Sequence, residues 1–481
     1  MNLRGGAATM HVPVWHYEIE SIIVLKNNKG TEENRARHLD YSIQLNKHFY
    51  KKASSKEDNT YYLFSPSDVP GLYEAFFKDQ EEFERLYNQY SNDSSIRKLE
   101  VNATELLSKI LIERQGTGRI YIMNVDNVNN YTPFIKEKAT IYSSNLCQEI
   151  ALPTIPLKEP GNDVEGEIGL CILSAINMLE MLTEDNKIDY KKMQNTVYTA
   201  VNTLDNLIDF QDYVNKMAER PAKNRRSIGI GVINFAAWAA RLGYKYTDKE
   251  LLNKVDEFFE TMSFFAIKAS IDLAKEKGQC EFINDTQWSK GILPFDRYNK
   301  NVDKLLDRKL TFNTDNEISK EFGTWNSVKE DLIKYGIRNS TLLSIMPSET
   351  SSLVSNATNG IEPPRGYTSV KVSKDGILKQ VVPNITKYKD NYTLLWKLPN
   401  NEATINISAV IQKWTCQAIS TNLNYDPKKY PDGKTPVIAM MKDVFKAYSL
   451  GLKTLYYHNT RDGQNEEELA NIGCESGACA I

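Results

Sequence analysis

The sequence lacks the features that define several classes of protein. It contains no run of about 18 apolar residues, so no transmembrane helix is predicted, and residues 1–6 do not resemble a signal peptide. The formal net charge is −3 and the pI is about 6.1, which gives no electrostatic sign of nucleic-acid or membrane binding. We therefore expect a cytoplasmic protein that contacts neither membranes nor nucleic acid directly.

Familiar metal, disulfide and dinucleotide patterns are also missing. None of the 6 cysteines forms a Cys-x-x-Cys pair, and the 5 histidines show no ligand spacing. The pair Gly229 and Gly231 lacks the third glycine and the acidic residue of a dinucleotide fingerprint, so it predicts a closely packed strand. We predict no metal site and interpret the cysteines as thiols of a reducing compartment.

What is present indicates strands that alternate with helices. The apolar stripe of Ile407, Ile411, Trp414 and Ala418 has helical spacing. Such alternation predicts an α/β layer or barrel. Buried strands are expected at residues 119–125, 168–173 and 341–346.

The chain divides into three parts by composition. Residues 1–118 are predicted to be mainly helical, with apolar stripes at 15–23 and 72–87, after a glycine-rich loop. Residues 119–463 form the main α/β part. Residues 464–481 are acidic, then small and polar, and are predicted to be a mobile tail.

Cys147 lies in the pentapeptide Asn145-Leu146-Cys147-Gln148-Glu149. Because no histidine is nearby, an ordinary nucleophile is disfavoured. A thiyl radical fits better: Cys147 would abstract a hydrogen atom, Glu149 would take a proton from a substrate hydroxyl, and Asn145 would hold that hydroxyl. A buried cysteine in a polar turn is the simpler alternative.

Residues 347–351 read Pro-Ser-Glu-Thr-Ser after a predicted strand. Ser348 is expected to cap the helix that begins there. The N–H groups of Glu349, Thr350 and Ser351 would then face a phosphate at the positive end of the helix dipole. A plain N-cap without a ligand explains the same pattern.

Four further residues are candidates for redox chemistry. Tyr456 and Tyr457 are either strand packing or a pair of phenols that passes an electron. Cys474 and Cys479 are spaced for a disulfide and would suit a thiol shuttle. Cys171, in a predicted strand, is either structural or redox-active.

Taken together, these segments resemble the large, catalytic subunit of class I (Ia-type) ribonucleotide reductases, in the enterobacterial and T4-like phage branch. The resemblance spans essentially the whole chain, which is similar to the carboxy-terminal portion of that subunit. The segments that carry it are residues 4–9, 145–149, 347–351, 356–365, 455–457 and 474–479.

The resemblance implies part of a ten-stranded α/β barrel, with Cys147 at the tip of a central finger loop, and a flexible C-terminal tail. It implies that Cys147 is the transient thiyl radical and that Glu149 accepts the proton of the 3′-hydroxyl beside the amide of Asn145. Cys171 would be one half of the dithiol that reduces the 2′ position.

The remaining roles are also implied by the resemblance. The diphosphate would be bound by Glu349, Thr350 and Ser351. The radical would pass through Tyr456 and Tyr457, and the active site would be re-reduced by Cys474 and Cys479. The specificity loop that links effector to substrate would contain Arg4, Gly5 and Gly6.

The implied reaction converts ribonucleoside diphosphates to 2′-deoxyribonucleoside diphosphates. No cofactor would be bound covalently; the di-iron tyrosyl radical centre would belong to a separate small subunit, and dNTPs or ATP would be effectors. Thioredoxin or glutaredoxin would supply electrons. The other half of the Cys171 pair is missing, so we expect a split subunit, in the host cytoplasm if phage-encoded, that needs a companion chain with the N-terminal half.

Two other interpretations remain. The chain is an inactive nucleotide-binding or regulatory remnant of a reductase subunit, or it is a stand-alone dithiol oxidoreductase. The complete set of radical-path and tail residues argues against a remnant. The absence of a Cys-x-x-Cys motif argues against the stand-alone oxidoreductase.

Overall fold

The computed structural model describes residues 6–159, 166–313, 315–373 and 376–461. These residues form an α/β structure, which confirms the predicted fold class. The strands are β1 (Thr9–Pro13), β2 (Asp40–Leu45), β3 (Thr60–Phe64), β4 (Lys98–Asn102), β5 (Ile120–Asn124), β6 (Ile172–Asn177), β7 (Ile228–Ile233), β8 (Thr368–Ser373), β9 (Gly376–Val381), β10 (Leu423–Tyr425), β11 (Thr454–Leu455) and β12 (His458–Thr460).

The helices vary from one turn to 29 residues, the longest being α10. They are α1 (Ile19–Ile22), α2 (Lys47–Ser54), α3 (Leu72–Lys78), α4 (Gln80–Asn92), α5 (Ala103–Thr117), α6 (Val125–Asn130), α7 (Tyr190–Phe210), α8 (Lys216–Arg225), α9 (Phe235–Leu242), α10 (Lys249–Lys277), α11 (Glu317–Phe322), α12 (Trp325–Tyr335), α13 (Glu349–Val354), α14 (Ile385–Tyr388), α15 (Glu402–Trp414) and α16 (Val437–Ser449). None of these described helices is both long and apolar enough to cross a membrane.

The largest sheet has the order β1-β2-β5-β11, in which β1, β2 and β5 are parallel and β11 is antiparallel. Every residue of β2 and β5 is buried, as expected for strands covered on both faces. The strand predicted at 119–125 is therefore confirmed. Since β2 and β5 share this sheet across residue 118, the two predicted parts are joined there, and their division stays a prediction.

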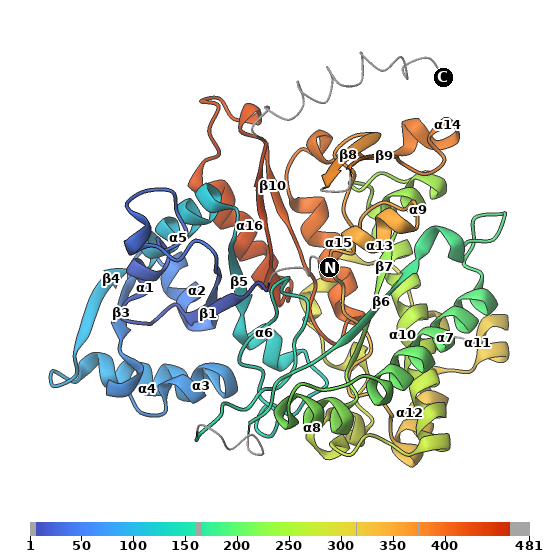
Figure 1. Cartoon of the computed structure of the whole chain (residues 1–481), viewed down its shortest axis with the longest axis horizontal. Helices are drawn as coiled ribbons and strands as arrows, with labels where there is room; N and C mark the ends of the chain where they lie inside the picture. The colour runs from blue at the N-terminus through green and yellow to red at the C-terminus, as the bar shows by residue number, and fades with distance from the viewer. Residues whose placement is uncertain (1–5, 160–165, 314, 374–375, 462–481) are drawn as a thin grey trace.

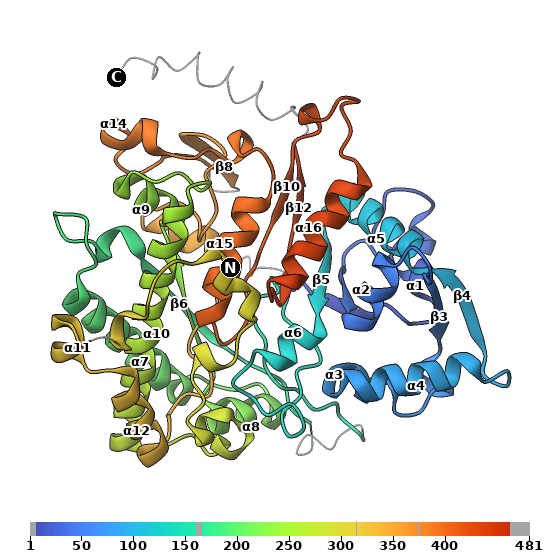
Figure 2. The same ribbon diagram turned by 180° about the vertical axis from the view of Figure 1, so that it is seen from behind.

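Helices lie on both sides of these central strands (Figures 1 and 2). On one side lie α2–α5 with the β3–β4 pair, and on the other lie α7, α10 and α12. The apolar stripe predicted for 72–87 is divided between α3 and α4, because Asp79 ends the first helix and its carboxylate caps the second by accepting from Glu81 N and Glu82 N. The stripe of α15 ends at Trp414, so Ala418 lies beyond the helix.

A second layer is built on β6 and β7, which are parallel. The strand predicted at 168–173 is wrong in its bounds: pairing with β7 begins at Ile172, whereas Ile168 N donates to Met217 O instead. Residues 341–346 run beside β7 but form only isolated bridges, at Leu343 and Ile345. They are therefore an extended segment rather than the predicted strand.

The two glycines of β7 permit close packing, as predicted. A Cβ on Gly229 would lie 2.6 Å from Leu173 Cδ2 and 2.8 Å from Ser344 Cβ. A Cβ on Gly231 would lie 2.5 Å from Met346 Sδ. Only residues without a side chain fit between β6 and the 341–346 segment here.

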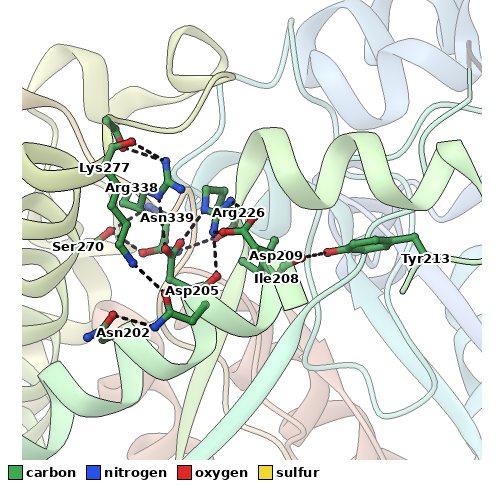
Figure 3. A network of polar contacts seen from close by, with 12 residues as sticks. Asn202, Asp205, Ile208, Asp209, Tyr213, Arg226, Ser270, Lys277, Arg338 and Asn339 are labelled. Atoms are coloured by element: carbon green, nitrogen blue, oxygen red, sulfur yellow. Dashed lines mark hydrogen bonds and ion pairs between the residues drawn. The ribbon is translucent and has the colours of Figure 1, made fainter. Parts of the chain in front are cut away.

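Behind β7 lies a buried network of charges (Figure 3). Arg226, at φ 51° after the end of α8, donates to Asp205 Oδ1 at 2.7 Å and to both carboxylate oxygens of Asp209 on α7. Asn339 Nδ2 donates to Asp205 Oδ1 and to Arg226 O, each at 3.0 Å. The network fixes the start of β7 against α7 and the 341–346 segment.

Candidate active site

The loop 145–149 is folded tightly on itself. Asn145 Oδ1 accepts from Ile150 N at 3.1 Å, and Asn145 O accepts from Gln148 Nε2 at 2.9 Å. Gln148 has φ 68°, a left-handed conformation that reverses the chain beside Cys147. Its side chain accepts from Ser42 Oγ of β2, and its carbonyl accepts from Thr454 Oγ1 of β11. The large sheet therefore supports the loop from both of these strands.

Cys147 is half-buried, and its sulfur faces a tyrosine. Tyr456 Oη donates to Cys147 Sγ at 3.5 Å. Ser420 Oγ donates to Cys147 O at 2.6 Å. Residues more than 250 positions away in sequence thus hold both the thiol and the backbone of Cys147.

Glu149 is buried, 3% exposed, beside the same serine. Ser420 Oγ lies 3.4 Å from Glu149 Oε2, and Glu149 O accepts from Ala418 N and Ser344 Oγ, each at 2.9 Å. Burial raises the pKa of the Glu149 carboxyl, while hydrogen bonds from Asn145 and Ser420 oppose the shift. A carboxylate of this kind readily exchanges protons.

Cys171 lies immediately before β6, and its sulfur is hydrogen-bonded. Gln417 Nε2 donates to Cys171 Sγ at 3.2 Å. Burial raises the pKa of the Cys171 thiol to about 12; the bond from Gln417 acts to lower it, and the charge of Glu149 acts to raise it. A Cβ at position 229 would lie 3.2 Å from this sulfur, so Gly229 leaves room for it.

Tyr456 and Tyr457 form a close ring pair between β11 and β12. Their centroids are 3.8 Å apart with planes at 30°. Tyr121 of β5 is a third ring, 4.8 Å from Tyr456 and 6.0 Å from Tyr457, and its hydroxyl donates to Asp40 Oδ2 at 2.8 Å. Burial, followed by hydrogen bonds with Tyr457 and Cys147, raises the pKa of Tyr456, so its phenol is protonated at neutral pH.

A buried arginine holds the backbone of this pair. Arg114 of α5 donates to Tyr456 O at 2.8 Å and to Tyr457 O at 3.3 Å. Tyr456 N donates in turn to Thr421 O at 2.7 Å. Burial lowers the pKa of Arg114 to about 10, and the side chain keeps its charge at neutral pH.

The predicted phosphate residues begin α13, which starts just beyond the Ile345–Ile419 bridge. Glu349, Thr350 and Ser351 are exposed there. The prediction that Ser348 caps the helix is wrong: its φ is 54° and it forms no cap bond, because a left-handed residue turns its hydroxyl away from the helix N–H groups. Within the described residues, the buried hydroxyls of Ser348 and Ser352 have no partner.

The other predicted site residues are at the ends of the chain. Gly6 is exposed, with open space where a Cβ would be. Arg4, Gly5, Cys474 and Cys479 lie outside the described residues.

Sequence analysis missed the segment 415–422, which contacts every part of this site. Its side chains or backbone bond Cys171, Glu149, Cys147 and Tyr456, and Asn422 Oδ1 accepts from Tyr457 N at 3.0 Å. Its only sequence signal is a run of polar residues, Thr-Cys-Gln-Ala-Ile-Ser-Thr-Asn, directly after an apolar helix.

Comparison with known proteins gives one consistent result. Residues 1–458 match the family model described as "Ribonucleotide reductase, barrel domain". The chain is 49% identical over 480 residues to the ribonucleoside-diphosphate reductase subunit alpha of Haemophilus influenzae, covering 100% of this chain and 61% of that protein. It is 50% identical over 485 residues to the subunit 1 alpha of Escherichia coli, with 100% and 61% covered.

A viral relative is nearly as similar. The chain is 46% identical over 481 residues to the subunit alpha of Enterobacteria phage T4, covering 99% of this chain and 61% of that protein. The chain thus spans about 61% of the length of these relatives.

Proposed function

Because the chain belongs to the family of ribonucleotide reductase barrel domains, we propose that it is the catalytic-subunit portion of a class I ribonucleoside-diphosphate reductase. The reaction would convert ribonucleoside diphosphates to 2′-deoxyribonucleoside diphosphates. One observation carries this proposal: Tyr456 Oη lies 3.5 Å from Cys147 Sγ, with the Tyr457 ring stacked behind it. This is a continuous path from a tyrosine pair to a thiol.

The chemistry follows from these contacts. The Cys147 thiyl radical takes a hydrogen atom from C3′, so that an S–H bond forms as the C3′–H bond breaks. Glu149, whose pKa burial raises, accepts the 3′-hydroxyl proton. Cys171 is one of the two thiols that reduce C2′ and become a disulfide.

The substrate's diphosphate would be bound at the start of α13. Glu349, Thr350 and Ser351 are exposed there, and the unpartnered hydroxyls of Ser348 and Ser352 add donors beside them. Cys474 and Cys479 would return electrons from thioredoxin or glutaredoxin. Arg4, Gly5 and Gly6 would respond to dNTP or ATP effectors.

Two partners are part of the proposal. A small subunit with a di-iron tyrosyl centre would generate the radical. The rest of the barrel, on a companion polypeptide, would cover the free edge of β6. Apolar side chains there are exposed, 41% at Ile168, 38% at Leu170 and 37% at Leu173, which supports a partner at this edge.

The test is reductase activity after reconstitution with the companion and the small subunit. Cys147→Ser should abolish turnover and leave assembly intact, whereas Cys280→Ser, at a buried thiol away from the site, should retain it. Retained turnover in Cys147→Ser would overturn the radical role. A wild-type complex that binds nucleotides without turnover would favour an inactive remnant, and failure of the two chains to co-purify would reject the companion.

A further inference from the structure

Gln417 is a completely buried amide whose orientation is determined by its neighbours. Its Oε1 accepts from Ala151 N at 3.1 Å. Because a backbone N–H only donates, the oxygen must face Ala151 and the NH₂ group must face the other way. The NH₂ group contacts Cys171 Sγ at 3.2 Å, Ile228 O at 3.2 Å and Thr341 Oγ1 at 3.3 Å. The donor toward the sulfur is therefore unambiguous.

The space around this sulfur is restricted on its opposite side. A Cβ at position 229 would come within 3.2 Å of Cys171 Sγ, so the sulfur lies against the bare backbone of Gly229. An N–H donor on one side and a backbone on the other leave the thiol little freedom to rotate. An N–H donor also favours a thiolate over a thiol, since the bond to a charged acceptor is stronger.

We propose that Gln417 is the positioning residue of Cys171, which aims its sulfur and stabilises its thiolate for thiol–disulfide exchange. This role rests on the proposed function for what Cys171 does in turnover. The state of the sulfur itself is measurable without turnover. Gln417 touches neither Cys147 nor Tyr456 through its side chain, so its effect is confined to the dithiol step.

The test is the rate at which iodoacetamide labels Cys171 in the full chain, followed by peptide mass spectrometry from pH 7 to about 10. Gln417→Met keeps the length of the side chain and removes the donor. We expect labelling to slow about 10-fold and the pH profile to move upward, because less thiolate is present. A loosened structure would have the opposite effect, since a more accessible thiol is labelled faster.

Two further variants sharpen the test. Gln417→Glu keeps an acceptor for Ala151 N and turns a second acceptor toward the sulfur, so its labelling should be at least as slow. Gln412→Met is the matched control: this buried amide donates only to the carbonyls of Thr415 and Gln417, so Cys171 labelling should not change. Cys280 and Cys416, 1% and 3% exposed, report folding because they should stay unlabelled.

Labelling of Cys171 in Gln417→Met at the wild-type rate or faster would overturn the proposal. In the reconstituted reductase, the same variant should lower kcat and leave the KM for the diphosphate unchanged. If the wild-type complex shows no reductase activity while the labelling result holds, the proposed function fails and the role of Gln417 at the sulfur stands.

Discussion

Two buried carboxylates in this molecule have opposite surroundings. Asp205, fully buried, is bonded by Arg226 at 2.7 Å and lies 3.4 Å from Arg338, with an amide of Asn339 at 3.0 Å. Glu149, equally buried, has only the neutral donors Asn145 and Ser420, and no described residue forms an ion pair with it. The first carboxylate is compensated by positive charge and the second is not.

The difference separates a structural group from a chemical one. A buried carboxylate between two guanidinium groups is held as an anion and links the elements that carry them. A buried carboxylate with neutral donors has a raised pKa, so proton exchange costs it little free energy near neutral pH. Three predictions test this contrast.

The largest effect is expected for Glu149→Gln in the reconstituted enzyme. Turnover should fall about 100- to 10,000-fold, because the proton acceptor is lost while the shape is kept. Its stability should not fall: the native state holds the Glu149 proton more tightly than the unfolded chain, so wild-type stability decreases as pH rises between the two pKa values. Urea unfolding at pH 5 and pH 8 should therefore show the variant gaining on the wild type at pH 8. A variant that loses stability at pH 8 would contradict this.

Asp205→Ala should instead destabilise the fold, by about 3–5 kcal/mol, because Arg226 would keep a buried charge without its closest partner. Urea unfolding of the chain measures the loss. Asp209→Asn is the matched control: that side chain is 55% exposed, so the change should cost less than about 1 kcal/mol. Equal losses in the two variants would show that burial does not govern the network.

The smallest effect is expected for Ser420→Ala, which removes a neutral donor shared by Cys147 and Glu149. Stability should fall by about 1 kcal/mol, and turnover about 10- to 100-fold because the loop is less well positioned. Ser408→Ala is the control, since that buried hydroxyl has no partner among the described residues. An unchanged turnover in Ser420→Ala would reject its positioning role.

Local patterns in the sequence predicted what depends on neighbouring residues. The apolar run of β5, the close packing at Gly229 and the stripe of α15 all follow from short-range periodicity. The loop around Cys147 was recognised by its resemblance to a family. The assigned roles of its residues stay predictions.

What could not be predicted depends on contacts between distant residues. Ser420 and Cys147 are 273 positions apart, and Gln417 and Cys171 are 246 positions apart. No periodicity encodes such pairs. The start of β6 was misplaced because its register is determined by β7, and the left-handed Ser348 was missed because the turn before α13 packs against Gly360, whose Cβ would lie 3.2 Å from Pro347 O.

The segment 415–422 has a consequence for how this site responds to motion. The two thiols, the carboxylate and the tyrosine pair are all attached to the same eight residues, either directly or through one hydrogen bond. When helices on either side shift, these groups will move together as one body. The separations across which electrons and hydrogen atoms must pass therefore vary much less than the outline of the molecule does.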